Sequence, residues 1–172
     1  GVEEVDYWTH RNALDNKVLP ASLAIAGGGV IGMEFASFFC SLGVKVTVIE
    51  MMDEILGGVD KELSALLRAE YAKKGIKFLL STKVTGLSKG EIGTVVAYEN
   101  AEGAATIEAE KLLLSVGRRP VMKGFGLENL GLELTERKCI KVDEHLQSSV
   151  PGVYVCGDLN GVSLLAHTAV RE

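Results

Sequence analysis

The hydrophobic pattern of residues 22–49 predicts a strand, a glycine turn, a helix and a second strand in succession. Residues 22–26 are a short apolar run that ends at Gly27, as expected for a buried strand. Residues 45–49 are rich in β-branched residues and predict the second strand. Gly43 lies where a helix C-cap belongs. It follows apolar residues that recur at helical spacing, namely Ile31, Phe35, Phe38, Phe39 and Leu42.

A second helix and a third strand are expected over residues 60–80. Asp60 is a candidate N-cap and Gly75 a candidate C-cap, and residues 76–80 form a strand-like apolar run. Strands that alternate with helices favour a parallel sheet with right-handed crossovers, so a three-layer α/β core is predicted. The apolar stripe expected on this helix comprises Leu63, Leu66, Leu67 and Tyr71.

From Val84 onward the pattern changes to that of antiparallel strands. Residues 94–99, 104–108 and 111–116 are strand-like runs separated by polar links. They predict a β-meander whose last strand is strongly apolar. The expected fold class is therefore α/β, with a Rossmann-like parallel sheet and an added antiparallel meander.

The two ends of the chain carry weaker signals. Residues 1–20 read as a connector with one short helix, for which Thr9 is a plausible N-cap. Residues 121–150 are mixed loop, residues 153–156 predict a buried strand, and residues 164–170 begin a helix.

Composition narrows the partners and the compartment. Of the 172 residues 47% are hydrophobic, enough for a core, yet no apolar run approaches the roughly 18 residues of a membrane span. A net charge of −5 without an extended basic cluster argues against nucleic acid and membrane partners. Residues 1–20 do not resemble a signal peptide. The three cysteines and three histidines lack metal-binding spacing, so no metal is expected, and the odd cysteine count favours a reducing, cytoplasmic setting.

The glycine turn fits the G-x-G-x-x-G pattern of dinucleotide-binding loops. A triple glycine alone is more often only a turn, but this one follows a predicted strand and opens a predicted helix. Gly27 permits the tight turn, Gly29 lets a pyrophosphate approach the helix N-terminus, and Gly32 lets the helix pack closely on the strand. We therefore expect NAD(H) to bind at the turn, which consists of Gly27, Gly28, Gly29, Val30, Ile31 and Gly32.

Two acids near this turn are candidate cofactor ligands. Glu50 ends the strand after the glycine helix, where a carboxylate accepts hydrogen bonds from the adenosine ribose and repels a 2′-phosphate. Met51 and Met52 follow it, rather than the arginine common in NADP enzymes, so NAD is favoured over NADP. Glu34 lies in the first turn of the helix, where the helix dipole alone would also explain an acid.

A second nucleotide-like feature lies near the end of the chain. Gly157 and Asp158 follow the apolar run 153–156, and a helix is expected soon afterwards. By itself a Gly-Asp pair after a strand is usually a turn.

Together these pieces resemble the FAD-dependent pyridine nucleotide–disulfide oxidoreductases. The matching stretches are AGGGVIGMEFASFFCSLGVKVTVIE, SVGRRP and VYVCGDLNGVSLLAHTAVRE. Their order and spacing match over nearly the whole chain, and the likeness is greatest to the branch that oxidises dihydrolipoamide with NAD. Val121, where Asn is usual, and Cys156, where an aliphatic residue is usual, depart from the family pattern.

The resemblance implies roles at matching positions. Gly117 and Val84 would contact NAD, and Glu34 would lie near the nicotinamide. Asp158 would bind the ribitol of FAD. The pyrimidine edge of the flavin would meet Leu164, Leu165, Ala166 and His167.

The family's C-x-x-x-x-C disulfide, its other glycine fingerprint and its catalytic His-Glu pair have no match here. The chain also starts without Met and ends in a predicted helix, so we expect a fragment with no catalytic residue of its own. The expected divisions are a connector from the FAD domain (1–20), the NAD-binding domain (21–118) and an incomplete C-terminal part of the FAD-binding domain (119–172).

The full-length enzyme implied by the resemblance oxidises dihydrolipoamide to lipoamide with NAD, through FAD and a redox disulfide. Its partner would be a lipoyl domain of a 2-oxoacid dehydrogenase or glycine cleavage complex, and it would be a homodimer. The fragment alone is expected to be inactive and not to retain FAD. Open alternatives are an NADH oxidase, a mercuric reductase, a transhydrogenase or a non-catalytic NAD-binding module.

Overall fold

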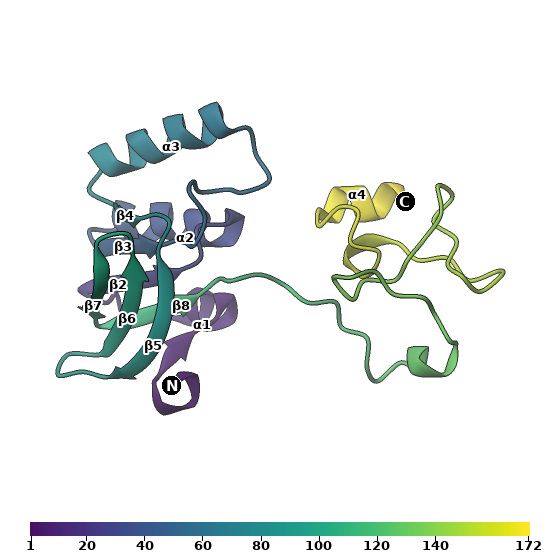
Figure 1. The fold of residues 1–172 in the computed structure, drawn as a ribbon, viewed down its shortest axis with the longest axis horizontal. Helices are drawn as coiled ribbons and strands as arrows, with labels where there is room; N and C mark the ends of the chain where they lie inside the picture. Colours follow the sequence, from purple (N-terminus) through teal and green to yellow (C-terminus); the bar gives the residue numbers. More distant parts are fainter. The chain divides into compact units, whose positions relative to one another are not determined.

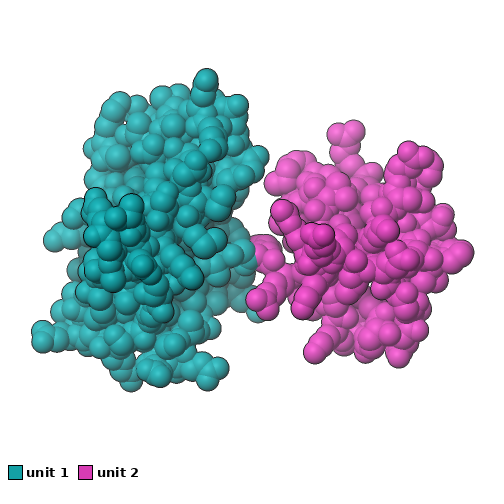
Figure 2. Space-filling model, in the orientation of Figure 1, with its two compact units in different colours: residues 1–117 teal, residues 118–172 magenta.

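The computed structural model describes all 172 residues and contains two compact units. Unit 1 is Gly1–Gly117 and unit 2 is Arg118–Glu172, coloured separately in Figure 2. Nearly all buried apolar side chains belong to unit 1, whereas only Ile140 and Val155 are buried in unit 2.

Unit 1 contains the regular secondary structure expected for an α/β fold (Figure 1). Its helices are a short 3₁₀ turn at Val2–Glu4, α1 (His10–Asp15), α2 (Val30–Ser41) and α3 (Lys61–Lys73). Its strands are β1 (Tyr7–Trp8), β2 (Ser22–Ala26), β3 (Lys45–Ile49), β4 (Lys77–Leu79), β5 (Lys83–Lys89), β6 (Thr94–Asn100), β7 (Gly103–Ala109) and β8 (Lys111–Leu114).

Five strands form the predicted parallel sheet, in the order β1-β8-β2-β3-β4. β2 and β3 are aligned along their whole lengths, from Ser22 opposite Lys45 to Ala26 opposite Ile49. The ends of these two strands therefore lie side by side, which brings the segment after β2 next to the segment after β3.

The two faces of this sheet are covered by different layers. Leu23 and Ile25 of β2 point to the helical side, where they pack in one core with Met33 and Phe39 of α2. Ala24 and Ala26 point to the other side and pack in a second core that includes Val96 of β6. The order β5-β6-β7 forms an antiparallel sheet, so the predicted third layer is a sheet and not a layer of helices.

The helix ends follow the predicted capping chemistry. The side chain of Asp60 accepts hydrogen bonds from the backbone N–H groups of Glu62 and Leu63. Gly43 and Gly75 have φ of +87° and +102°, the left-handed conformation that ends a helix most easily at glycine.

The buried face of α3 differs from the predicted stripe. Leu63 and Leu66 are 61% and 60% exposed, whereas Ser64 is buried and Leu67 and Tyr71 pack against the core. Residues 64, 67 and 71 also share one helical face, rotated slightly from the one that the leucines suggested.

Three strands differ from the sequence prediction. β1, within the predicted connector, pairs with β8. β8 itself was predicted to end the meander but lies in the parallel sheet between β1 and β2. β5 was not predicted, and its register shifts between Val84 and Gly86, which interrupts the regular alternation of a strand.

Unit 2 has little regular structure. It contains 3₁₀ turns at Leu127–Asn129 and Gly157–Leu159 and one short helix, α4 (Ala166–Arg171). The predicted strand at 153–156 is wrong: Tyr154 makes only an isolated bridge to Gln147 and is exposed. Unit 2 contains no regular strand with which this segment could form a longer ladder.

Candidate functional site

The glycine turn after β2 is a close crossing of backbone segments. Gly27 has φ of +107°, and its N–H donates to the carbonyl oxygen of Ile49 at 2.9 Å. A Cβ on Gly27 would lie 2.5 Å from the carbonyl oxygen of Ser115, and a Cβ on Gly32 would collide with the carbonyl oxygen of Gly27. Both positions therefore require glycine for reasons internal to the fold.

Gly29 differs from its neighbours because nothing in the chain fills the space beside it. It is the N-cap of α2, with φ of −71°, and a Cβ added there would meet no atom within 4 Å. No side chain caps this helix. The first N–H groups of α2, which starts at Val30, have no partner within the helix, and a helix N-terminus with free N–H groups favours an anion.

Glu50 follows β3 and holds the neighbouring part of the turn. Its Oε2 accepts a hydrogen bond from the Gly28 N–H at 2.6 Å, and its Oε1 accepts one from the Met52 N–H at 2.8 Å. Its backbone is also fixed, because its N–H donates to Leu79 and its carbonyl accepts from Thr82. The structure thus brings the predicted selectivity acid directly onto the glycine turn.

A cavity of about 520 Å³ lies at the carboxyl edge of the parallel sheet. Gly27, Met51 and Val116 line it after strands β2, β3 and β8, and Val84 lines it from β5. Gly117, the next residue after Val116, has φ of +126°. Ligands of open α/β sheets bind in this kind of crevice. The family resemblance pointed to Val84 on the β5 wall, although the strand β5 itself was not predicted.

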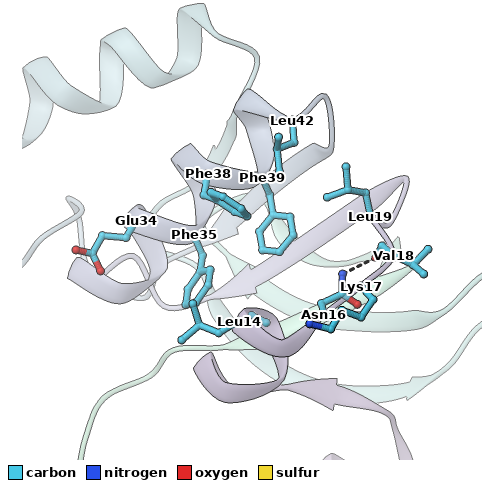
Figure 3. Close-up of a pocket in the computed structure, with 11 residues that line it drawn as sticks. Leu14, Asn16, Lys17, Val18, Leu19, Glu34, Phe35, Phe38, Phe39 and Leu42 are labelled. Carbon is cyan, nitrogen blue, oxygen red and sulfur yellow. Dashed lines mark hydrogen bonds between the residues drawn. The ribbon is translucent and has the colours of Figure 1, made fainter.

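Glu34 lies apart from that cavity. It is exposed on α2 and lines a different cavity, of about 490 Å³, between α1 and α2. In Figure 3 its carboxylate points away from the aromatic rings that line the apolar part of this cavity. Those rings include Phe38 and Phe39, which meet edge to face with centroids 5.2 Å apart.

An ion pair that was not predicted from the sequence links segment 50–56 to α3. Glu54 and Arg68 make two hydrogen bonds, Nε to Oε1 at 2.8 Å and Nη2 to Oε2 at 2.9 Å. The guanidinium of Arg68 lowers the pKa of the Glu54 carboxyl, although burial opposes this shift. On the same loop Lys61 pairs with Asp53 at 2.7 Å, with both side chains well exposed. The residues of each pair come from different elements, so no local spacing reveals them.

The residues that the resemblance linked to FAD all lie in unit 2. Asp158 lies in the 3₁₀ turn Gly157–Leu159, with its carboxylate 3.9 Å from the guanidinium of Arg118. Leu164 and Leu165 are exposed and precede α4, which starts at Ala166 rather than at residue 164. His167 lies in the first turn of α4 and is exposed.

Two further classes of site are not found. No helix in the structure is long and apolar enough to cross a bilayer. No group of three or more His, Cys, Asp or Glu side chains is arranged to bind a metal ion.

Comparison with known sequences connects this geometry to a family. The family model described as pyridine nucleotide-disulphide oxidoreductase matches residues 1–172. Dihydrolipoyl dehydrogenase of Acholeplasma laidlawii is 44% identical over 164 residues, which are 95% of this chain and 47% of that protein. The Thermus scotoductus enzyme of the same name is 41% identical over 170 residues, or 97% of this chain and 37% of the relative. The chain thus spans less than half the length of these relatives.

Solved structures give the same result. The HOCl-induced flavoprotein disulfide reductase RclA from Escherichia coli matches with a TM-score of 0.86 and 27% identity, over 99% of this chain and 39% of that one. LpdA from Mycobacterium tuberculosis matches with a TM-score of 0.84 and 29% identity, over 95% of this chain and 35% of that one. Matching motifs, fold and full coverage of the sequence agree, and the chain belongs to the pyridine nucleotide-disulphide oxidoreductase family.

Proposed function

We propose that this chain is the NAD(H)-binding portion of a dihydrolipoyl (dihydrolipoamide) dehydrogenase. The observation that carries the proposal is the contact between Glu50 and Gly28, which fixes a ribose-binding carboxylate beside a glycine turn. The names of the curated relatives support this member of the family.

The geometry around α2 fits the pyrophosphate of a dinucleotide. Gly29 leaves open space next to the N-terminus of the helix, where unpaired N–H groups and the helix dipole favour a negative charge. The adenosine would lie toward the cavity at the carboxyl edge of the sheet, in contact with Val84. Gly117 would also contact NAD, and Glu34 would lie near the nicotinamide end.

Local charges favour NAD over NADP. Glu50 keeps acceptor capacity for ribose hydroxyls after its two contacts to backbone N–H groups, because each carboxylate oxygen accepts about two hydrogen bonds. The basic residues Lys61 and Arg68, which follow it along the chain, each pair with an acid. Arg68 makes two hydrogen bonds to Glu54 and is therefore not free to bind a 2′-phosphate.

We assign residues 21–118 to the NAD-binding domain and residues 119–172 to the C-terminal part of an FAD-binding domain, with residues 1–20 as the connector. In the longer enzyme Asp158 would bind the ribitol of FAD, and backbone groups of 164–167 would approach the flavin. The flavin and the nicotinamide supply the hydride chemistry, while this chain orients them. The chain alone would then lack dehydrogenase activity and would not retain FAD.

The partners proposed for the longer enzyme are a second copy, forming a homodimer, and a lipoyl domain that carries dihydrolipoamide in a 2-oxoacid dehydrogenase or glycine cleavage complex. The resemblance to RclA, a flavoprotein disulfide reductase, favours as second candidate another disulfide-reducing member of the family.

Calorimetric titration of the 172-residue chain with NADH and with NADPH tests the proposal. We expect tighter binding of NADH, and a loss of roughly tenfold in NADH affinity for Glu50→Gln, because the neutral amide is a weaker acceptor than the carboxylate both for the ribose and for the Gly28 N–H. Glu102→Gln, at the exposed β6–β7 turn, is the matched control and should bind as the unmodified chain does. Equal or tighter binding of NADPH, or no binding by folded chain, would contradict the proposal.

A further inference from the structure

We propose that the ion pair between Arg68 and Glu54 positions segment 50–56 against the glycine turn and so sets the affinity for the ADP-ribose half of NAD(H). This inference rests on the proposed NAD(H) site and adds two positioning residues that do not themselves contact the ligand. Gly28 makes hydrogen bonds with both of its backbone polar groups.

Both contacts of Gly28 come from the segment that follows β3. Its N–H donates to Oε2 of Glu50 at 2.6 Å, and its carbonyl oxygen accepts from the Leu56 N–H at 2.9 Å. The side chain of Ile55 also packs there, since a Cβ added to Gly28 would lie 3.1 Å from its Cγ2. A shift of this segment would therefore move the middle of the glycine turn.

The segment does not hold this shape by local preference. Leu56 has φ of +54°, a left-handed conformation that is unfavourable for a leucine. Such a residue keeps its conformation only where the surrounding structure fixes it. Ile55 supplies one restraint, because its side chain is 1% exposed and belongs to the core on the helical side of the sheet.

The ion pair supplies a further restraint, beside the hydrogen bond from the Ser81 N–H to the carbonyl oxygen of Met52. The side chain of Glu54 is 12% exposed and that of Arg68 is 33% exposed, so the pair is better shielded from water than the Lys61–Asp53 pair. Two-point contact between a guanidinium and a carboxylate fixes orientation as well as distance. Oε1 of Glu54 also accepts a hydrogen bond from the Ile55 N–H at 2.9 Å. The ion pair is thereby linked to the backbone at Ile55, the residue just before Leu56. Through Glu54, Arg68 on α3 therefore restrains the backbone next to Leu56, whose N–H donates to the carbonyl oxygen of Gly28.

Three variants test this role: Arg68→Met, Glu54→Gln and the two together. Each is titrated with NADH and with ADP-ribose, beside Lys61→Met as a control that breaks the exposed pair on the same loop. We expect a five- to twentyfold loss of affinity for both ligands in all three variants, with the double variant no worse than the single ones. Lys61→Met should stay within about twofold. The double variant leaves no unpaired buried charge, so its NADH affinity tests the inference if a single variant does not fold.

The sign of the Glu54→Gln effect separates positioning from simple charge attraction. NADH is an anion, so removing a negative charge would strengthen its binding if charge alone mattered. Tighter binding by Glu54→Gln, additive losses in the double variant, or unchanged binding by Arg68→Met would overturn the inference. In those cases the unmodified chain would still bind NADH, whereas failure of the unmodified chain to bind would refute the proposed function itself.

Discussion

Gly29→Ala should separate ligand binding from folding at the glycine turn. The φ of −71° is accessible to alanine, and the added Cβ would meet no atom of the chain within 4 Å. Alanine restricts the unfolded chain and so stabilises by about 0.4–1 kcal/mol. It is a poorer N-cap than glycine by an amount of similar size, about 0.5–1 kcal/mol. The two effects nearly cancel, so the free energy of unfolding should change by less than about 1 kcal/mol.

Binding should respond very differently. The new methyl group would occupy the space through which a pyrophosphate approaches the first N–H groups of α2. Loss of one or two charged hydrogen bonds, at about 1.5–3 kcal/mol each, corresponds to a loss of at least tenfold in NADH affinity. Urea unfolding gives the stability and calorimetric titration with NADH gives the affinity. Unchanged NADH binding by Gly29→Ala would refute the placement of the pyrophosphate over α2.

Gly27→Ala and Gly43→Ala are the comparisons for this experiment. Gly27→Ala combines a φ of +107° with a Cβ only 2.5 Å from the carbonyl oxygen of Ser115, so it should destabilise by about 3 kcal/mol or more. Gly43→Ala has φ of +87° but no atom near the new Cβ, so only conformational strain, about 1–2 kcal/mol, is expected. NADH affinity of the folded Gly43→Ala chain should be unchanged.

Three further predictions concern stability. Because Arg68 holds the pKa of Glu54 below its ordinary value of about 4.3, the contribution of the pair is present above that pH and is lost as pH falls through the lower, folded-state pKa. Chemical unfolding between pH 7 and 3 should therefore show an advantage over Glu54→Gln that shrinks with acidification; a constant difference would contradict it. The buried Oγ of Ser64 has no hydrogen-bond partner, so Ser64→Ala should stabilise by up to about 1 kcal/mol in urea unfolding, whereas Ser41→Ala, whose hydroxyl bonds to the carbonyl of Ser37, should not. Unit 2 buries only Ile140 and Val155 among its apolar residues, so its backbone amides should exchange with solvent faster than those of β2 and β3, and equal protection would show that its stability has another source.

Local signals in the sequence predicted the elements that depend on local chemistry. Asp60 caps α3 with its own side chain, and Gly43 ends α2 in a left-handed conformation, each within a few residues of the pattern that indicated it. The proximity of Gly28 and Glu50 could also be inferred from the sequence, because parallel strands that end in register place their following residues side by side.

Other features depend on partners that are distant in the sequence. β1 is only Tyr7–Trp8 and exists because it pairs with Leu112 and Leu113 of β8. The run at 153–156 has the composition of a strand but makes only an isolated bridge. The pairing of Glu54 with Arg68 depends on how α3 returns over the loop, which no spacing encodes.

The double role of Glu50 links the cofactor preference of the proposed site to the shape of its backbone. The same carboxylate that would discriminate against a 2′-phosphate also accepts hydrogen bonds from the backbone N–H groups of Gly28 and Met52. Replacing it with a residue that welcomes the phosphate would leave two amides without their acceptor, at about 1–3 kcal/mol for each one kept from water. A change of preference from NAD to NADP would thus require at least two coordinated substitutions, one for the nucleotide and one to restore an acceptor. A substitution at this position alone, whether in evolution or by design, would therefore give a glycine turn that lacks these hydrogen bonds.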